Sequence, residues 1–240
     1  MKPLYLIFIV LYMVMVGCHN LHAQSIKDYY MHMPDSVLPY LTNVNKADMP
    51  DFINSKMAAK VKNRFQEITE MTQFTDDFLE IKTSPSSSFQ FKLLPKADST
   101  RIIVLITSVK APISDSQVSF YTTEWQKLPM SSFLSLPDVE DFVLNVGESR
   151  KFSSLDSCDI FSNDENYPDT ISEDLYAQVV RELNKALLYS LSFCPEDLSM
   201  RVYLTSPGYL NKEIRKVVES CIKKDPILLR WKDDKFLMEN

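Results

Sequence analysis

The strongest hydrophobic pattern outside the N-terminus lies in residues 101–125. Residues 102–106 are five apolar side chains in a row, mostly β-branched, as is typical of a strand covered on both faces. After a turn at 111–116, residues 117–122 alternate with a period of two, which predicts a second strand. We expect this pair to form the centre of a β-sheet. The alternation places Ile103 and Leu105 toward one layer, and Val104 and Ile106 toward the other.

Further strands are predicted on the N-terminal side of this pair. Residues 61–71 favour one exposed strand, because they are rich in threonine and charged residues. Residues 78–83 and 89–94 bracket the turn sequence Ser-Pro-Ser-Ser-Ser at 84–88, which is typical of a hairpin. Together, residues 60–125 predict an antiparallel meander of about five strands.

Short helices are predicted before the meander. Apolar residues spaced i, i+3, i+4 and i+7 from Ile26 predict an amphipathic helix that Pro34 ends. Residues 37–41 favour another helical turn or two. Asp48 is the candidate cap of a third short helix, which carries Pro50 near its start.

A segment of mixed character follows the meander. One short helix is predicted at 138–144, and residues 156–169 form an acidic, turn-rich loop. This loop lacks the central glycine and the terminal glutamate of an EF-hand, so we expect no calcium site there.

The C-terminal part predicts the order helix, strand, strand, helix, strand, strand. Thr170 and Glu173 form a candidate capping box for the first helix. Asn211 can cap the second helix, which Pro226 ends. The predicted strands are 187–193, 199–205, 227–231 and 235–238.

The fold class is therefore α+β. An antiparallel β-meander is preceded by short helices and followed by a helix-strand-strand-helix-strand-strand C-terminal half. The predicted division is 24–130 for the helices and meander, 131–170 for the connector and 171–240 for the C-terminal half. One continuous domain also fits this order.

The first residues predict export. An apolar run at 4–16 follows Lys2, is too short to span a bilayer as a helix, and precedes a region of small residues. We interpret residues 1–23 as a signal peptide cleaved between Ala23 and Gln24. A lipoprotein-type cleavage that leaves Cys18 lipidated stays open as the alternative. The first site is favoured because Ala23 places a small residue where signal peptidase requires one.

Composition narrows the function classes. Removal of residues 1–23 leaves 217 residues with a net charge of −7, and a chain of this size needs no metal or disulfide to stabilise its core. The sequence shows no basic stripe, so nucleic-acid binding is not expected. The whole chain has three glycines, too few for phosphate loops or dinucleotide-binding turns.

Histidine is equally scarce. Of the three histidines, only His32 remains after cleavage at Gln24. We therefore expect no histidine-based metal site, no catalytic triad and no cofactor. His32 ends the first predicted helix, where a surface or capping role is expected for it.

Three cysteines remain in the exported chain, and an odd number leaves at least one unpaired. A bridge between Cys194 and Cys221 is conceivable, because both are predicted at the same end of their layer. Side-chain direction argues against it, because Cys221 lies on the helix face expected to rest on strand 187–193, whereas Cys194 points to the opposite face. We predict that Cys221 is buried and unbridged. The third cysteine is Cys158.

Several stretches resemble one family of exported bacterial proteins. They are MPDSVLPYLT (33–42), KNRFQEITEMT (62–72), TDDFLEIKTSPSSS (75–88), SFYTTEWQKL (119–128), SPGYLNKE (206–213) and LLRWKDDKF (228–236). The chain is similar to the family known as domain of unknown function 3256, found in Gram-negative bacteria. The resemblance implies an exported protein of the periplasm or the outer-membrane surface, and it carries no assigned catalytic residues.

Two functions are compatible with these observations. The first is a non-enzymatic binding or scaffolding module of the cell envelope, whose partner is an envelope protein or a glycan. Trp125 and Tyr121 are its candidate exposed aromatic residues. It would meet a membrane only through a lipid anchor. The alternative is a periplasmic hydrolase that uses paired carboxylates, for which Asp76-Asp77 and Asp233-Asp234 are the acid pairs in the sequence.

Overall fold

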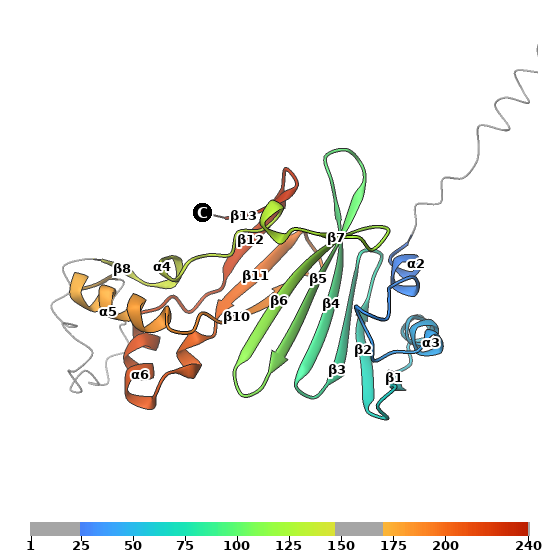
Figure 1. Cartoon of the computed structure of the whole chain (residues 1–240), viewed down its shortest axis with the longest axis horizontal. Coiled ribbons are helices and arrows are strands. Elements are labelled where there is room, and N and C mark those ends of the chain that lie inside the picture. The colour runs from blue at the N-terminus through green and yellow to red at the C-terminus, as the bar shows by residue number, and fades with distance from the viewer. Residues whose placement is uncertain (1–24, 147–169, 240) are drawn as a thin grey trace, which may run out of the picture.

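The computed structural model describes residues 25–146 and 170–239, which form two antiparallel sheets with helices at both ends (Figure 1). Helices α2 (Ile26–Met31) and α3 (Asn43–Asn54) lead into the seven-stranded sheet A. The strands of sheet A are β1 (Ala59–Lys62), β2 (Ile68–Phe74), β3 (Phe78–Ser84), β4 (Ser87–Pro95), β5 (Arg101–Lys110), β6 (Ser114–Thr122) and β7 (Lys127–Leu128). No helix of these residues is long and apolar enough to cross a membrane.

The second part of the described chain supplies a smaller sheet, three α-helices and two short 3-10 helices, labelled η. Sheet B consists of β10 (Tyr189–Phe193), β11 (Ser199–Leu204), β12 (Ile227–Lys232) and β13 (Lys235–Met238). Around it lie η1 (Met130–Ser132), α4 (Val139–Phe142), the pair β8 (Asn145–Val146) and β9 (Thr170–Ile171), α5 (Glu173–Leu183), η2 (Ser206–Tyr209) and α6 (Lys212–Ser220). The expected α+β class, with its strand order, is confirmed.

The meander is longer than predicted. Its seven strands pair in chain order, each antiparallel to the next. The prediction of one strand over 61–71 is wrong, because the chain turns at 63–67 and forms the hairpin of β1 and β2. The side-chain oxygen of Asn63 accepts hydrogen bonds from the backbone N–H groups of Phe65 and Glu67, at 2.9 and 3.1 Å. Gln66 takes a positive φ of 66°, so the turn forms without glycine or proline.

The N-terminal helices also differ in detail from the prediction. Helix α2 is confirmed, but residues 37–41 form turns rather than a helix. Asp48 is not a cap, because α3 begins before it, at Asn43. Thr42 and Asn45 form its capping box, in which each side chain accepts the backbone N–H of the other residue, both at 3.1 Å. This closes the first turn of α3.

Sheet A is covered on both faces, as the apolar run in β5 requires. Ile103 and Leu105 pack with α2 and α3, whereas Val104 and Ile106 pack with residues of sheet B. All four side chains are buried. The predicted division of the run between two layers is confirmed.

Strand β10 crosses the face of sheet A. The backbone N–H of Leu191 donates to Ser116 Oγ on β6, and that of Phe193 donates to Gln90 Oε1 on β4, both at 3.0 Å. Two residues of β10 therefore contact side chains of β6 and β4, the two neighbours of β5 in sheet A. The indole of Trp231 on β12 adds a hydrogen bond of 2.6 Å to the carbonyl of Pro95.

The helices at the C-terminal end form a cluster of their own. Helices α4, α5 and α6 bury Leu175, Val179, Val218 and Cys221 among themselves. The expectation that α6 rests on residues 187–193 is wrong, because the buried side chains of β10 face sheet A instead. Thr170 is not a cap either: it lies in β9, and Ser172 caps α5 by accepting the N–H of Leu175.

The predicted state of Cys221 is confirmed. Cys194 and Cys221 are both buried and neither forms a disulfide. Burial raises the pKa of the Cys221 thiol above its ordinary value. Cys158 and the acidic stretch 156–169 lie outside the described residues.

Candidate functional site

The residues singled out from the sequence do not converge on one site. Ala23, Gln24 and Cys18 lie outside the described residues. His32 is the C-cap of α2, with Nδ1 2.7 Å from the carbonyl oxygen of Asp28 on the protein surface. The structure thus gives His32 the capping role expected of it.

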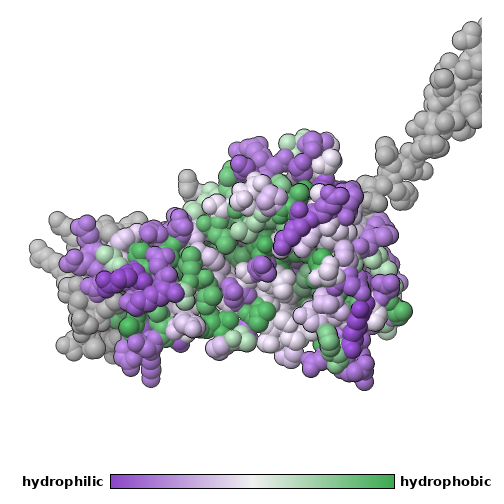
Figure 2. Space-filling model, viewed as in Figure 1, coloured by the Kyte–Doolittle hydropathy of each residue, from purple (hydrophilic) through white to green (hydrophobic). Residues whose placement is uncertain are grey.

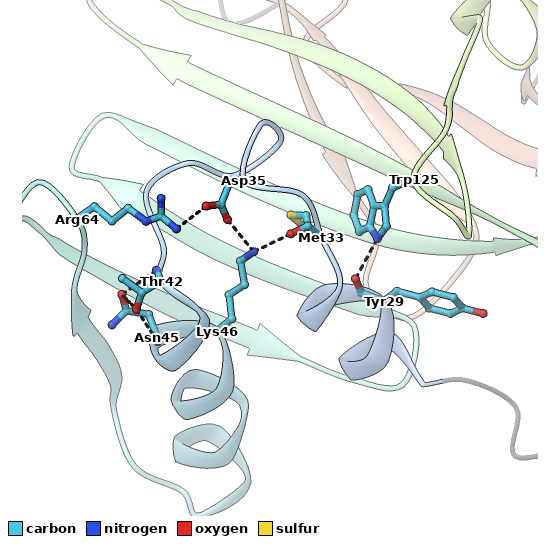
Figure 3. Close-up of polar contacts among 8 residues, drawn as sticks. All are labelled: Tyr29, Met33, Asp35, Thr42, Asn45, Lys46, Arg64 and Trp125. Atoms are coloured by element: carbon cyan, nitrogen blue, oxygen red, sulfur yellow. Dashed lines mark hydrogen bonds and ion pairs between the residues drawn. The ribbon is translucent and has the colours of Figure 1, made fainter.

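Trp125 and Tyr121 belong to the packing of sheet A against the N-terminal helices. The Trp125 ring lies 5.7 Å from Phe91 and 5.6 Å from Tyr121, measured between ring centres. Its indole N–H donates to the carbonyl of Tyr29 at 3.2 Å (Figure 3). Both side chains pack against the core cluster on this face. Trp125 therefore fastens α2 to sheet A and is not free for recognition.

Figure 3 also shows a polar cluster between the N-terminal helices and the β1–β2 hairpin. The side chain of Lys46, on α3, is only 1% exposed. Its ammonium donates to the carbonyl of Met33 at 2.7 Å and lies 3.6 Å from Asp35. Arg64 binds the other carboxylate oxygen of Asp35 at 2.5 Å. These contacts join three segments of chain, which is a structural role.

The surroundings of this cluster shift the pKa values of Lys46 and Asp35. Burial lowers the pKa of Lys46, because removal from water disfavours the charged amine more than Asp35 favours it. The hydrogen bond from Arg64 lowers the pKa of Asp35. Asp35 is engaged by both cations and the Lys46 ammonium is shielded from solvent, so the cluster is organised around internal contacts.

One acid pair predicted from the sequence borders a cavity. Asp76 and Asp77 lie at the edge of a cavity of about 430 Å³, together with Ser25, Leu93, Pro95, Arg101 and Leu198. The Asp77 carboxylate is bound to the buried amine of Lys92 at 3.0 Å. Lys92 in turn donates to the carbonyl of Pro195 at 2.9 Å. Asp77 is thus part of the join between the two sheets.

The other acid pair also serves the fold. Asp233 and Asp234 form the turn between β12 and β13, both with positive φ, and Asp234 accepts the N–H of Ala97 at 2.8 Å. Every described carboxyl group with a clearly shifted pKa has a lowered one; they are Asp35, Asp98, Glu124 and Asp197. A general acid requires a raised pKa.

A second hollow lies where the two sheets and α6 meet, and we call it the junction groove. Its volume is about 520 Å³. Its walls come from the β5–β6 hairpin, from β10 and β11, from η2 and from α6. The lining residues are Lys110, Ile113, Ser114, Ser190, Tyr203, Leu204, Thr205, Pro207, Gly208, Glu219 and Ile222. Figure 2 shows hydrophobic surface in the middle of the molecule, in the region of β6 and β10.

The wall formed by η2 is held firmly. The Arg215 guanidinium, on α6, donates to the carbonyl oxygens of Pro207 (3.0 Å), Gly208 and Leu210 (3.1 Å). Thr205 Oγ1 donates to the Ser114 carbonyl at 2.6 Å, which ties η2 to the β5–β6 hairpin. These hydrogen bonds join η2 to α6 and to the β5–β6 hairpin, and walls that are ordered before binding lose less entropy on binding.

Close packing also explains the glycine in this wall. A Cβ atom at Gly208 would lie 3.1 Å from Cγ1 of Ile113, closer than ordinary van der Waals contact. The hairpin tip and η2 therefore pack directly on each other.

The groove presents hydrogen-bonding groups and lies beside exposed aromatic rings. Its polar side chains are mainly hydroxyl groups, which can donate and accept hydrogen bonds. Tyr203 is 41% exposed, and Tyr209, beside the groove on η2, is 69% exposed. Exposed tyrosines are typical of recognition surfaces, because they offer a large rigid contact area with a polar end.

The family model described as "Protein of unknown function (DUF3256)" matches residues 18–160. The chain belongs to this family. Among solved structures it is similar to a domain of an uncharacterized protein from Porphyromonas gingivalis W83, with a TM-score of 0.69 and 22% identity, over 89% of this chain and 97% of that chain. At that identity the likeness shows the fold alone. No curated protein matches the sequence.

Sequence reasoning missed the junction groove of this DUF3256 protein. The groove is assembled from the β5–β6 turn, both strands of the β10–β11 hairpin and α6, which are far apart in the chain. The available signal was Ser-Pro-Gly-Tyr at 206–209, which carries the one glycine of the described residues. In the same residues no three histidine, cysteine, aspartate or glutamate side chains are grouped to hold a metal ion.

Proposed function

We propose that the protein is an exported, non-enzymatic binding module of the cell envelope and that the junction groove is its recognition site. The observation that carries the proposal is the groove itself: a preformed hollow with hydroxyl groups and exposed tyrosines, on a wall fixed by Arg215. Export is supported by the apolar run at 4–16 and the small residues that follow it. The partner is an envelope protein or glycan.

The hydrolase alternative has less support from the structure. Carboxylate catalysis requires two acidic side chains that face one substrate, one of them protonated. At the cavity beside Asp76 and Asp77, the second carboxylate is neutralised by Lys92. The groove contains a single carboxylate, that of Glu219.

Photo-crosslinking in the native cell tests the proposal. A photoreactive amino acid replaces Tyr203 or Tyr209 in one set of strains and Leu237, an exposed residue on β13, in a control strain. We expect the two tyrosine positions to capture the same envelope component and the control position not to capture it. Mass spectrometry of the adduct shows whether that component is protein or glycan.

Two results would contradict the proposal. The first is an absence of adducts at positions 203 and 209 while the protein is exported and folded. The second is hydrolysis of an envelope glycan by the purified protein that is lost in Asp76→Asn. That outcome would establish the hydrolase.

A further inference from the structure

The junction groove has two charged side chains among its lining residues, one of each sign. Lys110 lies at the end of β5, and Glu219 lies in the last turn of α6. Both are exposed, and neither forms an ion pair with the other or with any further described residue. The groove therefore holds an ammonium and a carboxylate apart, on walls that come from different parts of the chain.

Two backbone acceptors of the walls are already occupied within the protein. The Arg215 guanidinium donates to the carbonyl of Pro207, and Thr205 Oγ1 donates to that of Ser114. A protein segment that binds as an added strand needs free backbone groups along its path. Recognition in this groove therefore depends on side chains, which are the two charged groups and the exposed phenol of Tyr203.

The two charges restrict the kind of ligand that fits. A molecule that fills the groove removes Lys110 and Glu219 from water, and a charged group that loses water without gaining a partner costs free energy. A neutral sugar, or a ligand with charges of one sign, leaves at least one of the two groups unpaired. A ligand that carries both an ammonium and a carboxylate compensates both of them.

The size of the groove favours a short ligand. Its volume of about 520 Å³ falls within the range of roughly 300–1,000 Å³ that is typical of small-ligand sites. Ile113, Pro207 and Ile222 supply apolar contact for short aliphatic side chains. A few residues of peptide fit such a space, whereas a folded domain does not enter it.

We propose that the junction groove binds the short peptides that are attached to the glycan strands of the bacterial cell wall. Glu219 receives the side-chain amine of the diamino acid in such a peptide, and Lys110 receives one of its carboxylates. Within the envelope, these peptides combine both charges with small aliphatic side chains on a short chain. The inference rests on the proposed function and narrows the partner to the peptide part of the cell wall.

Calorimetric titration of the exported protein with a synthetic wall peptide tests the inference. The probe is the N-acetylated tetrapeptide alanine-γ-glutamate-diaminopimelate-alanine, with its side-chain amine and its carboxylates free. The reference probes are the same peptide with that amine acetylated, the same peptide with its carboxylates amidated, and the wall disaccharide without peptide. We expect the free tetrapeptide to bind and the disaccharide not to bind. High salt should weaken binding, because salt screens exposed charges.

Two variants assign each ligand charge to one side chain. Glu219→Gln and Lys110→Gln should each weaken binding of the free tetrapeptide by about tenfold, the loss of one charge pair. Acetylation of the ligand amine should weaken binding to the parent protein by a similar factor and cause no further loss in Glu219→Gln. Amidation of the ligand carboxylates should behave in the same way with Lys110→Gln. Such non-additive losses show that the two groups pair directly.

A matched control removes one charge of each sign outside the groove. Lys212→Gln with Glu213→Gln changes two residues in the first turn of α6 that do not line the groove, and it should bind like the parent protein. Thermal melting shows whether each variant is folded.

The inference is overturned if the parent protein does not bind the tetrapeptide, if the disaccharide binds as tightly, or if the losses from ligand acetylation and Glu219→Gln add. Photo-crosslinking at Tyr203 and Tyr209 separates this inference from the proposed function. Adducts with an envelope component, together with no tetrapeptide binding, would refute the inference and leave the proposed function in place. An absence of both would refute both.

Discussion

Lys46 is a cation that the fold holds almost entirely away from water. Its ammonium group is satisfied by the Met33 carbonyl at 2.7 Å, and its charge is balanced by Asp35 at 3.6 Å. Asp35 also binds Arg64 in the β1–β2 turn. Lys46 thus connects α3 to the loop after α2 and, through Asp35, to the β1–β2 hairpin.

Replacement of Lys46 by alanine should destabilise the protein. We expect the free energy of unfolding to fall by roughly 2–3 kcal/mol, because the Met33 carbonyl loses its donor and the aliphatic stem leaves a void. Urea denaturation measures the change. Lys56→Ala, at an exposed position in the same region, should cost well under about 1 kcal/mol, typical of a surface position. Equal effects of the two substitutions would show that the Lys46 contacts are unimportant.

Lys46→Met removes the amine and keeps an apolar side chain of similar length. Comparison with the parent protein therefore shows how the charge of Lys46 affects stability. The folded-state pKa of Lys46 lies below its ordinary value of 10.5, so the unfolded chain holds this proton more tightly. The Lys46 contribution to stability therefore rises as pH increases through the range between the lowered pKa and 10.5. The stability of the parent protein relative to Lys46→Met should increase over that range. A flat difference would contradict the lowered pKa.

For single residues, the sequence predicts roles that depend on neighbours in the chain better than roles that depend on tertiary contacts. His32 could be predicted as a helix end from Pro34, which follows it closely. The N-cap of α3, Thr42, could not be predicted in this way. The residue three positions later is Asn45, whereas a capping box usually has glutamate or glutamine there. The burial of Lys46 depends on the path of residues 33–35, which no periodic pattern specifies.

At the scale of elements, β5 determines the architecture, because it is buried on both faces. Its alternate side chains belong to two separate clusters, one with α2 and α3 and one with sheet B. A substitution in β5 therefore disrupts the packing of one cluster directly. It also affects the other cluster, because both include side chains of this strand.

Ile106→Asp should unfold the protein. Ile106 is 1% exposed between the two sheets, and a carboxylate there would have no partner. We expect loss of the cooperative thermal transition and recovery of the protein in inclusion bodies. Thr107→Asp places the same charge one residue away, at an exposed position, and should stay folded. A stable, soluble Ile106→Asp protein would show that β5 is not central.

Most strands could be predicted because their side chains alternate or are uniformly apolar. The hairpin of β1 and β2 could not, because its turn uses a positive φ at Gln66 and the Asn63 side chain instead of glycine or proline. The partners of α6 were also missed. Amphipathicity shows which face of a helix is buried, but does not identify what covers it.

At the scale of the molecule, the N-terminus determines where the protein works. If cleavage follows Ala23, the intact mass of the native protein corresponds to a chain that begins at Gln24 and carries no lipid. Mass spectrometry of the protein purified from its own cells measures this. A diacylglyceryl group on Cys18 would instead show that the protein is lipid-anchored.

The junction groove could not be predicted from the sequence, although the elements that form it could. Its lining combines the end of a hairpin in sheet A with β10, β11, η2 and α6. The packing of sheet B on sheet A brings these parts together. This packing includes the hydrogen bonds that Ser116 and Gln90 accept from β10, and hydrophobic periodicity contains no information on them.

The same two hydrogen bonds affect how this protein behaves at high concentration. The outward N–H groups of an edge strand can recruit a strand from another molecule and begin aggregation. At β10, two of those groups, on Leu191 and Phe193, are already bound to side chains of sheet A. A neighbouring chain would have to displace Ser116 and Gln90 before it could pair there. Ser116 and Gln90 thus hinder strand addition at β10. In other sheets, charged side chains on the edge strand often have this effect.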